Sequence, residues 1–295
     1  MFNVFQNRLE LAGILTTVTA LRISQGRSAE PIGSDLPVVK DALGRPFIPG
    51  SSFKGALRSR LESFLRGIVG NHRKLVADPA LESEWSLTAR EIQNLKAQHG
   101  TDAALTAAIV AETDLVSRLF GSPWIASKFQ VRDLTVLPDA WFGQYQERDG
   151  VAIDRDTETA AEGKLYDFQV VPAGTPFHFQ VVVENAEDWE LGLLMIGLHQ
   201  FETEQIPLGG GRSRGLGVVK LDLTQTWWMD YPEDQPEQLL RYLQRLVAGE
   251  KDHYQLNLET FAEHKQDWVQ SLIAKLTEEM QSSQRQSGST TTVVE

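Results

Sequence analysis

The sequence predicts an α+β fold built from two consecutive strand-helix-strand units. Residues 2–24 and 168–186 alternate apolar and polar side chains, which is the period of a β-strand. Each is followed by a segment in which apolar residues recur at the helical period, one starting at residue 51 and the other at 188–204. A strand pattern follows each of these helices, so the expected order is β-α-β-β-α-β. Ferredoxin-like folds have this order, here with insertions.

The first unit begins with a strand that contains a glycine. The stretch RLELAGILTTVTALRIS predicts one strand, or two halves joined around Gly13. After a polar loop, two short apolar runs flank Asp-Ala-Leu-Gly at 41–44, which predicts a hairpin with its turn there. The helix then starts after Pro-Gly, with Ser51 or Ser52 as the expected N-cap.

Two insertions are expected in this core. Residues 75–113 are rich in alanine and have helical spacing, which predicts an inserted helical subdomain. A short helix at 114–122 and a strand at 128–142 then complete the first unit. Residues 143–166 are polar and contain few bulky apolar side chains, which favours a long excursion in the form of an exposed hairpin.

The second unit ends in a short strand at 218–223, and the chain continues well beyond it. Two amphipathic helices are expected over 236–280, followed by a polar end. We therefore divide the chain into a core at 1–225, a C-terminal helical extension at 226–280 and a disordered tail at 281–295.

The composition restricts the function to a few classes. The 295 residues contain no cysteine, which excludes disulfides, thiolate metal sites and a cysteine nucleophile. The apolar runs are too short to span a bilayer and the N-terminus lacks a secretory layout, so we expect a cytoplasmic protein with no membrane partner. The formal net charge of -12 argues against nucleic-acid binding by the whole surface. Residues 45–74 nevertheless carry seven Lys or Arg and one acid, which predicts a basic face on an acidic body.

The basic stretch coincides with the start of the first helix. A helix N-terminus offers unpaired N–H groups and the positive end of the helix dipole, so it favours a phosphate. Ser51, Ser52, Lys54 and Arg58 lie there, the last two on one face of the helix. The alternative is a solvated basic face opposite an apolar stripe. A P-loop is excluded because Lys54 precedes Gly55 instead of following it.

The glycine-rich segment 208–217 is a second candidate for binding an anion. Its five glycines allow the backbone to approach a polyanion, while Arg212 and Arg214 provide forked guanidinium contacts. The segment leads into a strand, so it does not fit the dinucleotide-binding fingerprint. The alternative is a flexible connector, although three adjacent glycines carry an entropic cost in a plain turn.

The sequence contains few candidates for chemistry. The six histidines are scattered and no GxSxG motif occurs. Two acids remain beside the predicted phosphate site, Asp35 and Asp41. Asp41 begins the Asp-Ala-Leu-Gly turn, where an aspartate commonly bonds its own backbone. Asp35 lies in the loop that leaves the first strand, and from the residues alone both acids remain candidates.

Three stretches together resemble one known family: DLPVVKDALGRPFIPGSSFKGALRSRLE, DLVSRLFGS and PLGGGRSRGLG. They look like the backbone subunits of type III CRISPR-Cas effector complexes, which are members of the RAMP superfamily, and they occur in the family's order. The resemblance covers residues 1–70 and 114–225. The insertion at 75–113 and the C-terminal helices depart from the family pattern.

The resemblance implies a ferredoxin-like subunit that stacks with neighbouring RAMP backbone subunits, and with other effector subunits, along a guide RNA (crRNA). The excursion at 143–166 stands in the place of the family's thumb hairpin, which splays one base out of the guide-target duplex. In subunits that cut RNA, the aspartate positioned like Asp35 is required for metal-dependent cleavage of the target RNA, so the resemblance implies a catalytic Asp35 that holds Mg²⁺ or orients the target 2′-hydroxyl. The residues implied to bind guide RNA are Ser51, Ser52, Lys54, Arg58, Gly210, Gly211, Arg212, Ser213 and Arg214.

Three alternatives remain open. The first is a catalytically inactive crRNA-binding scaffold of the same complex. The second is a repeat-RNA processing nuclease, which predicts a histidine near the glycine-rich segment; the nearest in sequence is His199. The third is a ferredoxin-like protein that binds no RNA.

Overall fold

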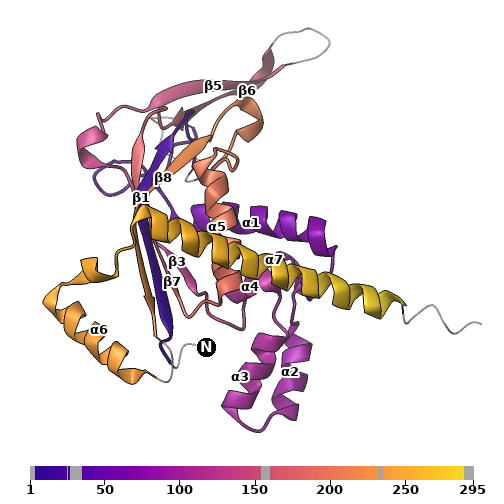
Figure 1. Cartoon of the computed structure of the whole chain (residues 1–295). Coiled ribbons are helices and arrows are strands. Elements are labelled where there is room, and N and C mark those ends of the chain that lie inside the picture. The colour runs from indigo at the N-terminus through magenta and orange to yellow at the C-terminus, as the bar shows by residue number, and fades with distance from the viewer. Residues whose placement is uncertain (1–3, 25, 27–34, 154–159, 232–234, 289–295) are drawn as a thin grey trace, which may run out of the picture.

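A four-stranded antiparallel sheet with the order β3-β7-β1-β8 forms the centre of the fold (Figure 1). The computed structural model describes residues 4–24, 26, 35–153, 160–231 and 235–288. Helices connect β1 to β3 and β7 to β8, so the predicted ferredoxin-like order is confirmed. The strands are β1 Asn7–Thr17, β3 Phe129–Val131, β7 Pro176–Glu184 and β8 Val219–Asp230.

The glycine of β1 lies where the strand register shifts. β1 is one strand that pairs with β7 and β8, and its register against β8 shifts between Ala12 and Gly13. A Cβ atom at Gly13 would lie 2.3 Å from the carbonyl oxygen of Asp222. Any larger residue would therefore force β8 away, which explains why the strand carries a glycine there.

Helices cover one face of the sheet. α1 (Gly50–Val69) and α5 (Asp188–Glu202) lie against it, and α4 (Leu115–Phe120) packs beside them. Phe53 of α1 is fully buried, with its ring centroid 4.5 Å from that of Phe201 and 5.2 Å from that of Phe179. The apolar stripe that predicted α1 therefore faces the main core.

The C-terminal helix belongs to this core. α7 (Leu258–Gly288) crosses α5 so closely that a Cβ atom at Gly192 would lie 2.1 Å from the carbonyl oxygen of Trp268 (Figure 1). Trp268 and Leu272 are each 2% exposed. The expected boundary at residue 225 falls inside β8. α7 also continues to Gly288, so the disordered tail expected from residue 281 is wrong up to that residue, and residues 289–295 lie outside the described part of the chain.

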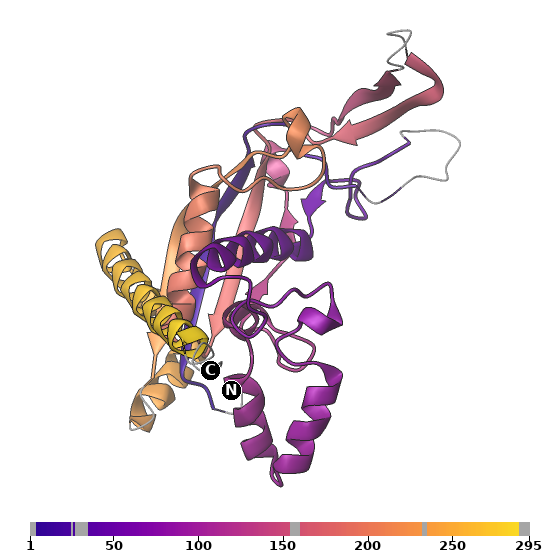
Figure 2. The same cartoon turned by 90° about the vertical axis from the view of Figure 1, so that its right-hand side faces the viewer.

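The two insertions lie at opposite ends of the molecule (Figure 2). The expected hairpin is present: β5 (Gln146–Ile153) pairs antiparallel with β6 (Ala160–Val170) and projects from the body. Residues 154–159, within the expected tip, lie outside the described residues. At the other end, α2 (Ala89–Gln98) and α3 (Asp102–Ala111) supply the helices expected over 75–113.

Two segments expected to be single strands are each divided. The stretch 168–186 contributes to both β6 and β7, because the chain turns between them at Gly174, whose φ is +79°. The stretch 128–142 forms β3 and then β4 (Leu134–Thr135), which pairs with β2 (Phe47–Ile48) in a separate small sheet. In each case one part belongs to the central sheet and the other to a separate two-stranded sheet.

α6 (Pro236–Ala248) covers part of the opposite face of the sheet. Leu239 and Tyr242 of α6 pack onto Trp227 and Met229 of β8 and onto Tyr231, the residue that follows β8. This second helix completes the pair expected over 236–280. Short 3-10 turns occupy Glu82–Glu84, Pro138–Ala140, Arg212–Arg214 and Lys251–Tyr254.

Candidate nucleic-acid interface

The loop that carries Asp35 is attached to the root of the β5–β6 hairpin. The backbone N–H of Asp35 donates to Oδ1 of Asp167 on β6, with a donor–acceptor distance of 2.9 Å. Leu36 forms a parallel bridge with Phe168, and the N–H of Gln169 donates to the carbonyl of Leu36 at 3.1 Å. Asp35 is half-buried. The sequence did not identify Asp167, which lies 132 residues away with no local motif around it.

Asp41 has a local structural role, as its position at the start of the turn predicts. Its Oδ1 accepts hydrogen bonds from the backbone N–H groups of Leu43 and Arg45, both at 2.9 Å. Its Oδ2 accepts one from Nε of Arg45, also at 2.9 Å. The backbone N–H of Arg45 is the largest influence that lowers the pKa of Asp41. Asp41 therefore holds the turn.

The N-cap expected at Ser51 or Ser52 is wrong. α1 begins at Gly50, and Pro49 occupies the cap position without a side-chain hydrogen bond. The N–H of Gly50 donates instead to Oδ1 of Asp133 at 2.8 Å. A carboxylate 83 residues away in sequence thus satisfies this N–H. Ser51 is exposed and Ser52 half-buried, within the first turn of the helix.

The two basic residues of the predicted phosphate site contact the 117–127 segment. Nζ of Lys54 donates to Oγ of Ser127 at 2.8 Å. Burial lowers the pKa of Lys54, and the charge of Arg58 lowers it further. The Arg58 guanidinium donates to Oε1 of Glu62, the carbonyl of Gly121 and Oγ of Ser117, at 2.7, 3.0 and 3.0 Å. With a side chain only 17% exposed, Arg58 connects α1 to α4, and its predicted guide contact stays a prediction that this geometry does not favour.

The glycine-rich segment is a closed loop pinned to the chain that leaves β1. Gly209 has a φ of +72°, and a Cβ atom there would lie 2.1 Å from the carbonyl oxygen of Arg22. The N–H of Gly210 donates to that same carbonyl at 2.8 Å, and the N–H of Gly217 donates to the carbonyl of Ala20 at 2.9 Å. These contacts give the glycines a structural reason, so the structure does not favour a flexible connector.

The tip of this loop presents its polar residues to solvent. Gly210, Arg212, Ser213 and Arg214 are exposed and Gly211 is half-buried. Nε of Arg212 donates to the carbonyl of Gly209 at 3.0 Å, which holds the guanidinium over the loop. The arrangement combines backbone close to the surface with two cations, as the sequence predicted for an anion-binding segment.

A small apolar cluster brings three of these parts together. It consists of Phe168 and Val170 from the hairpin root, Leu216 from the glycine-rich segment and Ala20 from the chain leaving β1, with Leu36 packed against it. The Arg22 guanidinium lies 4.7 Å from the centroid of the Phe168 ring. The Asp35 loop, the hairpin root and the glycine-rich segment therefore form one continuous surface at one end of the sheet.

The acidic side chains of this surface do not form a complete set of ligands for a divalent cation. Among the residues that the structure describes, no group of three or more His, Asp or Glu side chains is arranged to hold a metal ion. The backbone N–H of Asp35 bonds Asp167 Oδ1, so the backbone of Asp35 lies next to the Asp167 carboxylate. Mg²⁺ commonly binds through one or two carboxylates plus substrate phosphates and water, so a site at Asp35 would need RNA to complete it.

The model of the RAMP superfamily matches residues 14–220. The chain belongs to the RAMP superfamily. It is similar to three proteins, each named "CRISPR system Cms endoribonuclease Csm3". That of Enterococcus italicus is 27% identical over 218 residues, which cover 72% of this chain and 89% of the relative. That of Methanocaldococcus jannaschii is 28% identical over 222 residues, covering 73% and 79%. That of Mycobacterium tuberculosis is 46% identical over 56 residues, covering 18% and 24%.

The RAMP match includes the candidate surface and the start of α1. Asp35, the start of α1, the β5–β6 hairpin and the glycine-rich segment all lie between its ends. α6 and α7 lie beyond it. Across the described part of the chain, no helix is long and apolar enough to cross a membrane.

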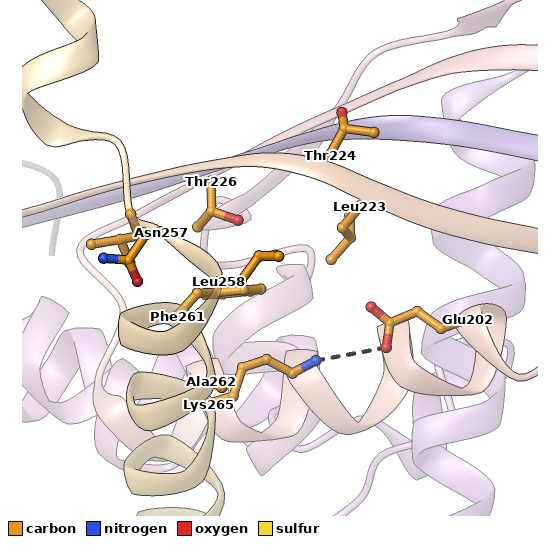
Figure 3. A pocket seen from close by; sticks show the side chains of 10 residues that line it. Glu202, Leu223, Thr224, Thr226, Asn257, Leu258, Phe261, Ala262 and Lys265 are labelled. Atoms are coloured by element: carbon orange, nitrogen blue, oxygen red, sulfur yellow. Dashed lines mark ion pairs between the residues drawn. The ribbon is translucent and has the colours of Figure 1, made fainter.

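A pocket of about 200 Å³ lies outside the candidate surface, between β8, the end of α5 and the start of α7 (Figure 3). Lys265 reaches across it toward Glu202, with Nζ 3.6 Å from Oε2. Nδ1 of the exposed His199 lies 2.9 Å from the same carboxylate oxygen. His199 is therefore engaged at the α5–α7 contact, which gives no support to the processing-nuclease alternative.

Proposed function

We propose that this chain is a backbone subunit of a type III CRISPR-Cas effector complex that binds crRNA and cleaves complementary target RNA. The observation that carries the proposal is the attachment of Asp35 to the hairpin root, beside an arginine-bearing loop, within a RAMP fold. The relatives named as endoribonucleases support catalysis over the alternative of an inactive scaffold.

Guide binding is assigned to the tip of the glycine-rich segment and to the start of α1. The exposed loop tip, with Arg212 and Arg214, contacts the phosphate backbone through guanidinium forks and backbone N–H groups. Ser51 and Ser52 contribute hydroxyl groups at the positive end of the α1 dipole. Lys54 adds a half-buried cation next to them, whereas Arg58 acts mainly as a structural link.

Cleavage is assigned to Asp35. Its carboxylate orients the 2′-hydroxyl of a target nucleotide toward the adjacent phosphate, in the in-line geometry that strand scission needs. Asp35, with Asp167 beside it, is the residue that would hold a divalent cation such as Mg²⁺, which when bound stabilises the charge that develops on the phosphate. The β5–β6 hairpin, in the role of the thumb, separates the target nucleotide from its neighbours so that this geometry becomes accessible.

The partners in this proposal are crRNA, target RNA, neighbouring RAMP backbone subunits and other type III effector subunits. The cytoplasmic location expected from the sequence is part of the same proposal. A single catalytic carboxylate is a small catalytic apparatus, so we expect slow cleavage in which the distorted RNA supplies much of the rate enhancement.

The test is cleavage of an end-labelled RNA complementary to the guide by the assembled complex with Mg²⁺. Asp35→Ala and Asp35→Asn are expected to lower the rate of cleavage at discrete sites by at least about 100-fold, while target binding is retained. Asp139→Ala is the matched control, because Asp139 is an exposed aspartate on the 3-10 turn after β4. Persistence of every product in both Asp35 variants would mean that the chain is a scaffold without cleavage of its own.

A further inference from the structure

Three aromatic side chains lie together just before β5. The Trp141 and Phe142 ring centroids are 5.6 Å apart with an interplanar angle of 34°, and those of Trp141 and Tyr145 are 5.0 Å apart at 57°. Phe142 is the outermost ring, with 64% of its surface exposed. We call these three residues the Trp141 cluster. The Phe142 ring packs against Trp141, which in turn packs against Tyr145, so the exposed ring is presented on an ordered aromatic support.

The Trp141 cluster is held in place by contacts with Gly44, Lys40 and the main core. The hydroxyl of Tyr145 donates to the carbonyl of Gly44 at 2.6 Å, and burial raises the pKa of Tyr145 to about 12, so the phenol remains a donor at neutral pH. Nζ of Lys40 lies 4.2 Å from the centroid of the Tyr145 ring. Trp141 packs against the main core. A ligand that stacks on Phe142 therefore meets a preorganised surface.

The Trp141 cluster adjoins the Asp35 loop. Lys40 and Gly44, which contact Tyr145, belong to the segment that runs from Asp35 to the start of α1. Nζ of Lys40 also donates to Oε1 of Gln169 at 2.9 Å, two residues after Asp167 on β6. The cluster thus reaches the same hairpin root as Asp35, from the β5 side.

We propose that the exposed ring of Phe142 stacks on an unpaired nucleobase of the bound RNA, next to the position where Asp35 acts. The inference rests on the proposed function and adds to it a base-stacking site. A nucleobase fits this surface because it is flat, because any base offers a π-face to an aromatic ring, and because the Lys40 ammonium beneath the cluster favours a polyanion. A docked protein subunit is the competing occupant, and the experiment separates the two.

The experiment measures the affinity of the assembled complex for RNA complementary to the guide. Loss of one stacked base corresponds to about a tenfold change in affinity. Phe142→Ala and Phe142→Leu are expected to weaken binding by about that factor, whereas Phe142→Trp retains wild-type affinity. Because no phosphate contact is lost, the dependence of affinity on salt is expected to stay the same. Phe64→Ala, which removes a 38% exposed ring on α1, is the matched control.

A second arm identifies the base. RNAs that each lack one base at successive positions are compared on wild-type and Phe142→Ala complexes. At one position the missing base is expected to weaken wild-type binding by about tenfold and to have no further effect in the variant. The two losses are not additive there, because the base and Phe142 are the two partners of one contact. Additive losses at every position would overturn the proposal.

Two outcomes would assign Phe142 to a protein partner instead. One is full affinity in Phe142→Leu, since an apolar side chain suffices for a protein contact. The other is release of subunits on size exclusion by Phe142→Ala and equally by Leu43→Ala, which removes the neighbouring 76% exposed side chain. If the wild-type complex binds no guide-complementary RNA, the proposed function itself fails. If it binds and all Phe142 variants bind equally, only the stacking site fails.

Discussion

The backbone N–H of Asp35 donates a hydrogen bond to the carboxylate of Asp167, a residue of β6. The bond holds the candidate catalytic loop against the hairpin root, at the point where both meet the glycine-rich segment. Substitutions of Asp167 can separate its role as a hydrogen-bond acceptor from its role as a negative charge.

Asp167→Ala is expected to slow target cleavage by roughly five- to tenfold, which corresponds to about 1 kcal/mol for one lost hydrogen bond. Asp167→Asn keeps an Oδ1 acceptor and is expected to retain most of the rate. Single-turnover cleavage measures both, at several Mg²⁺ concentrations. A positioning role predicts an unchanged Mg²⁺ midpoint; if Asp167→Asn is as slow as Asp167→Ala and needs more Mg²⁺, Asp167 acts through its charge.

Gly209→Ala is expected to destabilise the protein and weaken RNA binding. Its φ of +72° and the Arg22 carbonyl 2.1 Å from the added Cβ leave no room for a side chain. The left-handed conformation alone costs about 1–2 kcal/mol, so we expect the melting temperature to fall by about 5 °C once the displaced carbonyl is included. Gly210→Ala is the control, because its Cβ meets nothing within 4 Å. Equal melting temperatures for the two variants would show that the loop is not pinned as described.

The stability contributed by Glu91 is expected to depend on pH. The hydrogen bond from Arg73 is the main cause that lowers the pKa of Glu91 from its ordinary value of 4.5 to about 2. The folded state therefore favours the carboxylate, so the stabilisation is fully present above pH 4.5 and is lost as the pH falls toward 2.

The Glu91 prediction is measured by urea unfolding of wild type and Glu91→Gln between pH 7 and pH 3. Because the pair is partly exposed, we expect a difference of about 0.5 kcal/mol at pH 7 that shrinks below pH 4.5. Glu250→Gln controls for the loss of one exposed charge. A difference that is constant over the whole range would contradict the lowered pKa.

Trp268→Ala is expected to destabilise the whole fold. Trp268 is 2% exposed and lies where α7 crosses Gly192 of α5, so its truncation leaves a cavity in the main core. The expected loss in the free energy of unfolding is about 3–5 kcal/mol. Met280→Ala, near the end of α7 and 39% exposed, should change it by less than about 1 kcal/mol. Independent unfolding of α7, seen as a separate transition in Trp268→Ala, would mean that the helix is an appendage.

Local patterns in the sequence were sufficient to predict several elements. Apolar residues at the helical period identified α1 and α5, and alternation identified β1, where Gly13 marks the register shift. Alternation cannot reveal which sheet a strand joins. The run at 168–186 therefore read as one strand although Gly174 turns the chain between β6 and β7.

The candidate site depends more on contacts between residues that are distant in sequence. The loop position made Asp35 one of two candidates and the family resemblance singled it out, while the glycine-rich segment pointed to Arg212 and Arg214, which are exposed. Asp167 and Asp133 had no local signal, because their partners lie 132 and 83 residues away. The N-cap prediction failed for the same reason, since Asp133 supplies the acceptor that a capping serine would have provided.

The ends of the RAMP match fall on two strands that pair with each other. Residue 14 lies within β1 and residue 220 within β8, so a polypeptide of 14–220 would keep only the pairs Thr16–Lys220 and Thr17–Val219 of the ladder between them. This polypeptide would also lack α7, the helix that crosses α5 at Gly192. The segment shared with relatives is thus a unit of homology but not a unit of folding, and a chimera that exchanges it must carry β8 to Asp230 and α7 along with it.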